Sequence, residues 1–405
     1  MRPTTTTTVC QEFDFRQITP DQSFDFYKWF LSQGVSYGMV SYELDFVMEN
    51  MICLDGLRSN VSAADILFQG MADAAQLLNI PMQWCIATPA AALQTLLYPS
   101  VTNMRASVDY RGGVAWDIGL SSLFMWALNI APSKDTFWTT DNGDSATTMG
   151  GCDPPACPND HSDSGCELNT VIAAMSTGPV AFSDALNHTN VKRILRTCRS
   201  DGVLLQPDKP LTTMDSHIEN RWRILQSYSG QSIRDVWAYY VVAHRLSNLP
   251  DEEVAVAVDE LWPRPKADSS WFVVWNGGGE DFACVENGAQ AASCGDFITP
   301  NSTIMIPTTP DDFQTTRISI FPACPSNRWV LLGELSKFVS LSSKRFSDIE
   351  CIGNEGINFN VYGSKDETVT ISAIHSGIVH VQNLTLSHKG AHWLSFRGPP
   401  SIDVQ

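Results

Sequence analysis

The stretch SYELDF (41–46) is a short apolar run that closes on an acidic residue, and two further short runs follow it: MQWCIATP (82–89) and NMRASVDY (103–110). The segment between the first two runs, residues 62–78, has helical spacing and gathers its apolar residues on one face: Ala63, Ile66, Leu67, Ala74, Leu77 and Leu78. Short buried strands that alternate with amphipathic helices are typical of a parallel sheet.

The same alternation continues to about residue 210. A second helical pattern recurs in Trp116, Leu120, Leu123, Phe124 and Leu128, and the strand candidates are Tyr37–Asp45, Met82–Ala87, Asn103–Val108, Thr136–Thr139 and Pro179–Asp184. These patterns predict an α/β fold, part of a TIM-type β/α barrel. Because polar residues at the carboxyl ends of barrel strands line the active site, Asp45, Asp109 and Asp184 are candidates for chemistry.

After about residue 220 the pattern changes to short strand-like runs divided by Gly, Pro, Asn and Asp turns, for example WFVVWN (271–276), AHWLSF (391–396) and INFNVYG (357–363), in which apolar and polar residues alternate. We therefore expect an antiparallel β-sandwich in this half of the chain, with the Pro-rich and acidic stretch 251–268 as an exposed connection. The predicted domains are a disordered N-terminus at 1–20, a barrel region at 21–218, incomplete on its N-terminal side, and an antiparallel β domain at 219–405.

The charge balance limits the partners. With 44 acidic against 26 basic residues the net charge is −18, which disfavours nucleic acid as a partner and favours a neutral ligand. No apolar run is long enough to span a bilayer, so we expect no membrane partner either. The sequence has no phosphate-binding Gly loop, and we expect no cofactor.

Eleven Cys indicate an oxidising compartment. Cys152, Cys157 and Cys166 lie within one short segment whose spacing, together with His161, matches no common zinc pattern, so we expect no metal there and a loop tied by at least one disulfide. Four glycosylation triplets begin at Asn60, Asn187, Asn301 and Asn383. Together these features predict a secreted glycoprotein, although no signal peptide is visible.

Carboxylates at two strand ends suit one reaction class. Cleavage or transfer of a glycosidic bond typically uses two carboxylates, which lie ~5 to 5.5 Å apart in retaining enzymes. Asp45 and Asp109 close two of the predicted strands. For any single Asp, capping of the next helix is the simpler interpretation.

The order of motifs from about residue 20 to 218 resembles the barrel of raffinose synthases and related α-galactosidases. It comprises YELDF, a long helix, MQWCIATP, NMRASVDY, the strand DTFWTT (135–140) and the run from STGPVAFSD (176–184) to PLTT (210–213). The resemblance implies a carbohydrate substrate and a retaining glycosidase, hydrolase or transglycosidase, that acts on α-linked sugars.

The family's motifs carry over residue by residue. Asp45 corresponds to the nucleophile of the Lys-x-Asp motif, while Arg105 and Asp109 correspond to the sugar-binding arginine and the acid/base of Arg-x-x-x-Asp. Thr177-Gly-Pro and Ser183-Asp184 match the motif of the last strand, which makes Asp184 a substrate-binding candidate. Glu43 replaces the family's Lys, which removes a cationic donor, and it is predicted to accept hydrogen bonds from sugar hydroxyls or to pair with Arg105.

Trp84 and Trp138 are candidates for stacking on a sugar ring, and packing inside the fold is an equal alternative for each. Few residues precede the first strand, so we expect the remaining barrel strands on a missing N-terminal segment or in an oligomer. Two other functions stay open. One is a non-catalytic sugar-binding or structural protein derived from such an enzyme, and the other is a polysaccharide lyase, which the charge disfavours.

Overall fold

The computed structural model describes residues 18–107, 118–140, 165–184, 186–218, 222–230, 238–245, 254–266, 271–276, 297–306 and 315–397. The chain divides into two compact units, one containing residues 1–108 and 124–133 and the other residues 109–123 and 134–405. Each unit is described here by itself. The domain boundary expected near residue 218 stays a prediction.

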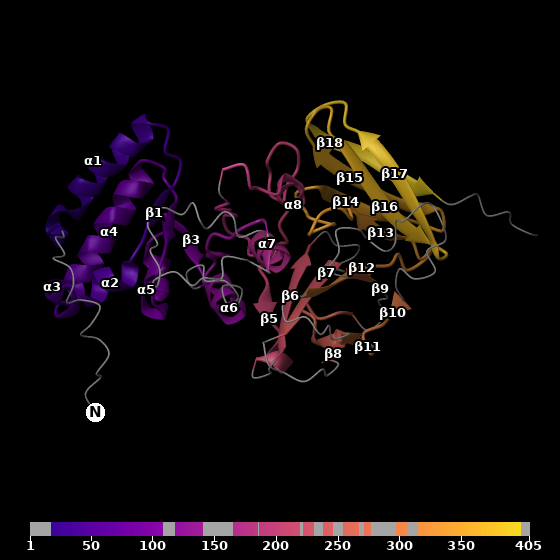
Figure 1. Cartoon of the computed structure of the whole chain (residues 1–405), viewed down its shortest axis with the longest axis horizontal. Coiled ribbons are helices and arrows are strands. Elements are labelled where there is room, and N and C mark those ends of the chain that lie inside the picture. Colours follow the sequence, from indigo (N-terminus) through magenta and orange to yellow (C-terminus); the bar gives the residue numbers. More distant parts are fainter. Residues whose placement is uncertain are drawn as a thin grey trace, which may run out of the picture. The chain divides into compact units, whose positions relative to one another are not determined.

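The first unit is built on a four-stranded parallel sheet (Figure 1). Its strands run in the order β1 (Tyr42–Leu44), β2 (Met82–Trp84), β3 (Val101–Arg105) and β4 (Ala131–Ser133). The connections contain η1 (Pro20–Gln22), α1 (Ser23–Ser36), α2 (Val47–Ile52), α3 (Asp55–Arg58), α4 (Val61–Leu77), α5 (Pro89–Gln94) and η2 (Thr95–Leu97). Helix α6 (Gly119–Ala127) leads into β4. The predicted α/β fold with parallel strands joined by helices is confirmed.

Helix α4 begins where its sequence predicts. The side chain of Asn60 caps it by accepting hydrogen bonds from the amides of Ser62 and Ala63 at 3.1 and 3.3 Å. Its buried face differs from the expected one. Of the six expected residues only Leu67 and Ala74 are buried, Ile66 and Leu77 are exposed, and the other buried residues are Ala64, Phe68, Met71, Ala72 and Ala75. The reason is that α4 packs on α1 as well as on the sheet, and Gly70 permits the close approach to α1: a Cβ there would lie 2.8 Å from the amide nitrogen of Phe24.

Three expected strands are corrected. The first run forms a strand only at β1, because α1 continues to Ser36 and a turn follows it. Residues 136–139 and 179–184 share a single parallel bridge, Phe137 to Phe182, instead of full strands. The strand next to β3 is β4, which the sequence hides because its three residues include Pro132. Proline is tolerated at the edge of a sheet, where its missing N–H faces away from the neighbouring strand.

The second unit contains α7 (Cys166–Met175), α8 (Val191–Leu195) and an antiparallel six-stranded sheet. In spatial order the sheet holds β10 (Phe297–Ile298), β9 (Trp271–Asn276), β12 (Thr315–Pro322), β7 (Ala238–Arg245), β6 (Trp222–Ser229) and β5 (Thr212–Thr213). The unit also contains two short 3-10 helices, η4 (Asp215–His217) between β5 and β6 and η5 (Val258–Glu260) before β9. The change to antiparallel strands after residue 220 is confirmed.

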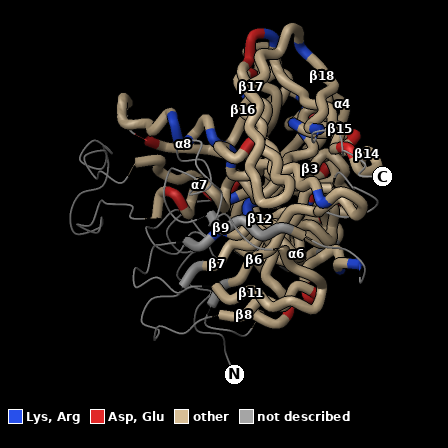
Figure 2. The backbone as a smooth tube through the Cα atoms, turned by 90° about the vertical axis from the view of Figure 1, so that its right-hand side faces the viewer, with Lys and Arg blue, Asp and Glu red and all other residues tan. Residues whose placement is uncertain are grey.

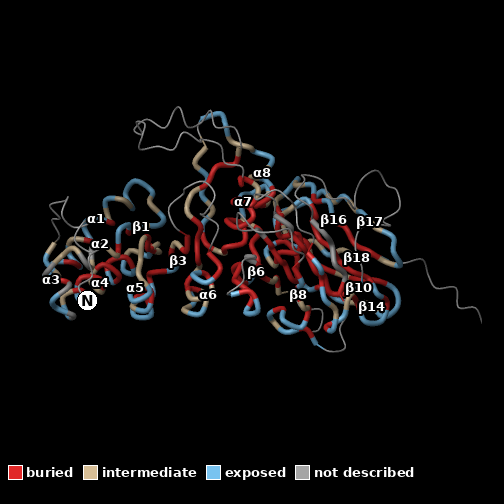
Figure 3. The backbone as a smooth tube through the Cα atoms, turned by 60° about the horizontal axis from the view of Figure 1, so that its bottom comes forward, coloured by how far each residue is buried: buried red, intermediate tan, exposed pale blue. Residues whose placement is uncertain are grey.

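A two-stranded ribbon, β8 (Val254–Ala257) with β11 (Thr303–Ile306), shares a hydrophobic core with the six-stranded sheet. Val256 and Ile306 of the ribbon are fully buried, as is Trp271 of the sheet. Figure 3 shows buried residues along the strands of this unit. The expectation that 251–268 is an exposed connection was therefore wrong for β8. Val254 and Val256 of β8 face the core, whereas Asp259 and Glu260, which follow the strand, are exposed.

The last part of the chain forms two three-stranded antiparallel sheets around one core. One contains β13 (Val330–Gly333), β16 (Thr368–His375) and β17 (Ile378–Thr385), and the other contains β14 (Phe346–Ile352), β15 (Gly356–Gly363) and β18 (Gly390–Arg397). Buried Trp329 and Phe346 lie in the core, and a disulfide joins Cys324 to Cys351. Two sheets that share a core agree with the predicted β-sandwich.

Of the predicted disordered N-terminus, residues 1–17 lie outside the described part of the chain, and Pro20 already begins η1. Within the described ranges, no helix combines the length and the hydrophobicity needed to cross a bilayer.

Candidate active site in the first unit

The parallel sheet of the first unit has two chemically different faces. Side chains alternate along each strand, and the register aligns Leu44, Trp84 and Met104 on one face, where all three are buried. The neighbouring register row consists of Glu43, Gln83 and Asn103 on the opposite face. One face of the sheet is therefore apolar and the other is polar.

Trp84 belongs to the apolar face. It is 1% exposed, and its ring lies 5.2 Å from that of Phe68 on α4 and 5.9 Å from that of Tyr98, measured between centroids. Because these neighbours enclose it, the indole fills the helix side of the sheet and offers no open ring face to a sugar in this structure. The geometry favours the packing interpretation of Trp84 over the stacking one.

The polar face ends in a row of reactive groups at the carboxyl ends of three strands. Asp45 follows β1, Cys85 follows β2 and Arg105 closes β3. The backbone holds the first two level, since the amide of Cys85 donates to the carbonyl of Leu44 at 2.9 Å. Asp45 is exposed and Arg105 is half-buried, whereas Cys85 is 2% exposed.

The pKa of the Cys85 thiol is shifted by burial and by the charged residues around it. Burial raises the pKa of its thiol first, and the hydrogen bond it donates to the Asp45 carboxylate raises it further. The Arg105 guanidinium acts in the opposite direction, and the negative charges of Asp45 and Glu43 add smaller increases to the pKa of Cys85. The thiol is thus held protonated as a hydrogen-bond donor. The charges of Glu43, Asp45 and Arg105 all affect the pKa of this one buried thiol, so the fold places these three predicted residues around Cys85.

Glu43 is held by its cross-strand neighbour. The amide Nε2 of Gln83 donates to its Oε1 at 3.0 Å, and the two residues are register partners on the polar face. The two residues therefore present an amide and a carboxylate side by side. Such a pair donates and accepts hydrogen bonds, as sugar hydroxyls also do.

The turns after Asp45 and Cys85 are strained. Phe46 and Ile86, which follow them directly, both have left-handed backbone conformations with φ of 56° and 48°. This region is unfavourable for side chains with a Cβ, and especially for β-branched Ile. Parallel hydrogen bonds stabilise both turns, from Val47 to the carbonyl of Cys85 and from Met48 to that of Ile86. Strain of this kind is concentrated at functional sites.

The remaining predicted residues lie in the second unit or outside the described residues. The carboxylate of Asp184 accepts hydrogen bonds from the amide and the hydroxyl of Thr139, both at 2.7 Å, next to the bridge between Phe137 and Phe182. Asp184 thus joins two segments of its own unit. Trp138 is 8% exposed. Asp109, the predicted acid/base, lies outside the described residues.

The cysteine loop is only partly described. Cys166 begins α7 as a buried thiol, while Cys152, Cys157 and His161 lie outside the described ranges. The expected disulfide in this loop stays a prediction. Within the described part of the chain, no three His, Cys, Asp or Glu side chains gather as a metal site would require.

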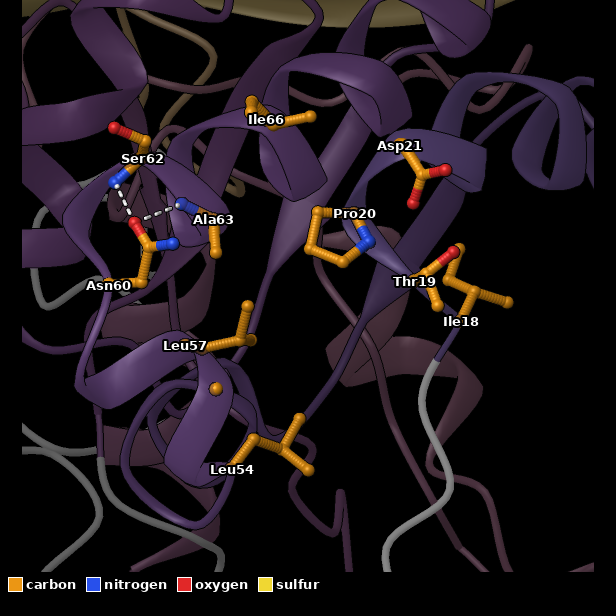
Figure 4. Close-up of a pocket in the computed structure, with 11 residues that line it drawn as sticks. Ile18, Thr19, Pro20, Asp21, Leu54, Leu57, Asn60, Ser62, Ala63 and Ile66 are labelled. Atoms are coloured by element: carbon orange, nitrogen blue, oxygen red, sulfur yellow. Dashed lines mark hydrogen bonds between the residues drawn. The ribbon is translucent and has the colours of Figure 1, made fainter.

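Near the start of α4 the first unit also has a pocket of about 530 Å³ (Figure 4). Its walls are mainly apolar and come from the residues before α1, from α3 and from α4: Ile18, Pro20, Leu54, Leu57, Ala63 and Ile66. Asn60 and Ser62 lie at its edge, where Asn60 is occupied in capping the helix. None of the predicted site residues lines this pocket, so it is distinct from the polar row.

Sequence reasoning overlooked Cys85, although it lies in the quoted run MQWCIATP. Its position directly after a strand was the available signal, since the residue level with Asp45 on the next parallel strand must lie beside it.

Comparison with known proteins gives little beyond this geometry. No protein-family model matches the chain, and no characterised protein matches it in sequence. Among solved structures it is similar to a glycoside hydrolase family 97 enzyme in complex with acarbose, from Pseudoalteromonas sp. strain K8, with a TM-score of 0.38 and 10% sequence identity. The similarity covers 64% of this chain but 38% of that enzyme, so the chain spans well under half of the enzyme's length.

Proposed function

We propose that this chain is part of a retaining glycosidase or transglycosidase that acts on α-linked sugars, similar to α-galactosidases and raffinose synthases. The observation that supports the proposal is the convergence of Glu43, Asp45 and Arg105 around Cys85 at the carboxyl ends of parallel strands. Active sites of barrel enzymes are built at this end of the sheet. The resemblance of the motifs assigns the same positions independently.

In this proposal Asp45 is the nucleophile. Its carboxylate attacks the anomeric carbon, the glycosidic bond breaks and a glycosyl ester forms. Asp45 is exposed, so a substrate can reach it. The thiol of Cys85 donates a hydrogen bond to this carboxylate, and the positively charged guanidinium of Arg105 lies near the same thiol. In this proposal the two groups orient the carboxylate toward the sugar.

Asp109 is the proposed acid/base. It protonates the leaving oxygen and then removes a proton from water or from an acceptor sugar, which gives hydrolysis or transfer. Arg105 holds sugar hydroxyls through its planar donors. The Glu43 and Gln83 pair takes the place of the family's Lys as a hydroxyl-binding group, so we propose that the preferred sugar differs in the hydroxyl that the Lys would bind.

Variants of the two aspartates test the mechanism on an activated aryl α-galactoside and on a natural α-galactoside. Asp45→Asn should abolish turnover of both, because an amide cannot form the ester. Asp109→Asn should lose the natural substrate, yet still react with the aryl substrate, whose leaving group needs no proton. Azide should then restore turnover and yield an α-glycosyl azide.

A matched control is Asp73→Asn, an exposed aspartate of α4 that accepts a hydrogen bond from Gln69. It should keep full activity. Undiminished turnover in Asp45→Asn, or a β-configured azide product from Asp109→Asn, would contradict the assigned roles.

The second candidate is a non-catalytic sugar-binding protein. It is favoured by one observation: Glu43 adds a carboxylate where the family has a cation, and Gln83 already engages it. In that case calorimetry should detect sugar binding that survives in Asp45→Asn, without turnover in any variant.

We also propose that the chain passes through the secretory pathway. Asn60, Asn187, Asn301 and Asn383, the four acceptor residues, are all exposed, and Asn60 caps α4 through its oxygen, which leaves its nitrogen for a glycan. The disulfide Cys324–Cys351 fits an oxidising compartment. Expression in a secretory eukaryotic host should give protein whose mass falls on treatment with an endoglycosidase, and an unchanged mass would contradict this.

A further inference from the structure

Three arginines in the second unit share one carboxylate. Glu167 lies in the first turn of α7, and its two oxygens contact Arg196 Nη1 at 3.0 Å, Arg317 Nη2 at 3.3 Å and Arg193 Nε at 3.4 Å. Figure 2 shows the basic residues along α8, to which Arg193 belongs. We call these four residues the arginine cluster.

The arginine cluster carries more positive than negative charge. Arg193 also donates a hydrogen bond to the carbonyl of Thr139, and without counting it the two guanidiniums of Arg196 and Arg317 face the one carboxylate of Glu167. The excess is poorly solvated, because the side chains of Arg193, Arg196 and Arg317 are only 12%, 10% and 4% exposed. The pKa of Arg317 is lowered to about 10: burial lowers it most, the charge of Glu167 counteracts this, and the nearby charge of Arg196 adds to the lowering. The cluster would be stabilised by a further negative charge.

One donor in the cluster has no acceptor. Nη1 of Arg317 is buried and makes no hydrogen bond, although Nη2 of the same side chain reaches Glu167. The ring of Phe338 lies between the two neighbouring guanidiniums, 4.2 Å from the Cζ of Arg196 and 5.0 Å from that of Arg317. Because guanidinium N–H groups point outward in the plane, the ring cannot satisfy Nη1. A buried charged donor without an acceptor is costly.

We propose that the arginine cluster binds a small inorganic anion, chloride, at Nη1 of Arg317. Chloride accepts hydrogen bonds, carries a single charge and is compact enough for a site screened from solvent. The N-terminal end of α7, where Glu167 lies, adds a favourable dipole for an anion. A neutral sugar could not offset the charge. The arginine cluster and the proposed active site share no residue, and the proposed anion site does not depend on the proposed function.

Chloride titration of the full chain tests the proposal. Excess ³⁵Cl NMR linewidth should appear with the protein and be competed by bromide, and the melting temperature should rise to saturation in sodium chloride but not in sodium glutamate of equal ionic strength. Arg317→Gln should weaken chloride binding at least tenfold. The matched control is Arg264→Gln, which removes the same charge from an exposed pair with Asp259 and should bind chloride normally.

If Arg317→Gln fails to fold, a second variant that is expected to strengthen chloride binding still tests the proposal. Glu167→Gln removes the competing carboxylate at nearly constant size, so chloride should bind more tightly, with a larger rise in melting temperature. Absence of saturable chloride binding in the unmodified protein would overturn the proposal, as would unchanged or weaker binding in Glu167→Gln or unchanged binding in folded Arg317→Gln.

Discussion

A buried carboxylate, Glu367, should make the stability of the second unit depend on pH. Its side chain is 7% exposed and contacts the guanidinium Nη2 of Arg345 at 2.6 Å. It also accepts hydrogen bonds from the backbone amides of Ser364 at 3.0 Å and Ser200 at 3.1 Å, which lie far apart in the sequence. Glu367 is therefore a cross-link between distant segments of the second unit.

The size of its contribution follows from its pKa. Burial by itself would raise the pKa of Glu367, but the hydrogen bonds from Arg345 and from the two amides outweigh burial and lower it from 4.5 to about 2. In the unfolded chain a Glu titrates near ~4.3. At ~1.4 kcal/mol for each pH unit of difference, ionised Glu367 contributes about 3 kcal/mol to the free energy of unfolding.

The sign of the pH dependence is fixed by the direction of the shift. Because the folded pKa lies below the unfolded one, the contribution is complete above about pH 5 and is lost as the pH falls toward 2. Glu367→Gln should therefore lower the free energy of unfolding by about 3 kcal/mol at pH 7, and by only about half as much near pH 3. Arg345 keeps its ion pair with Glu334 at 3.0 Å, so the variant should fold.

Urea unfolding followed by circular dichroism at pH 7 and pH 3 measures this difference. The control is Glu355→Gln, since Glu355 is 70% exposed and lies 3.7 Å from an exposed Arg397, and such a surface pair contributes under ~1 kcal/mol. A stability gap between Glu367→Gln and the unmodified protein that is the same at both pH values would refute the argument, as would a gap below ~1 kcal/mol at pH 7.

Three further experiments test the packing of the core, the cap of α4 and the disulfide. Trp84→Ala should destabilise the first unit by ~3 to 5 kcal/mol because the indole is 1% exposed, whereas Trp29→Ala, at a ring 59% exposed, should change stability by less than ~1 kcal/mol; thermal denaturation distinguishes them. Asn60→Ala should cost ~1 kcal/mol through loss of the α4 cap, and Asn60→Ser should recover most of it in protein from a host that does not glycosylate; urea midpoints will show whether both hold. Replacing Cys324 and Cys351 together by Ser should cost ~2 to 4 kcal/mol, because the disulfide closes a loop of 27 residues, and equal stability under reducing and oxidising conditions would argue against this.

The sequence by itself determined the order of the two kinds of sheet. Helical spacing between short apolar runs predicted parallel strands, and alternation such as INFNVYG (357–363), which lies within β15, predicted antiparallel strands. These signals are reliable because a half-buried strand or helix must repeat its apolar residues at its own structural period. The same argument placed Asp45 at a strand end. Arg105 was expected inside the strand Asn103–Val108, and the structure instead ends β3 at this residue.

The strand period also contained information that sequence reasoning left unused. Trp84 lies between Gln83 and Cys85, so in a strand it must face away from both. Once Glu43 and Asp45 are assigned to the polar face, only the register between β1 and β2 is needed to assign Trp84 to the opposite one. That register depends on backbone hydrogen bonds between distant segments, such as those from Tyr42 to Pro81 and from Cys85 to Leu44, which no local window of sequence contains.

Only the tertiary structure decided which distant groups meet. The strand β4 pairs with β3 although its residues include Pro132, because the edge of a sheet requires no further N–H donor. Arg317 reaches Glu167 across 150 residues of sequence, and the unpartnered Nη1 that motivates the anion site exists only in that packing. Local preference favours a helix or a strand within a few residues. The burial of a charge and the number of its partners depend on every segment that packs around it.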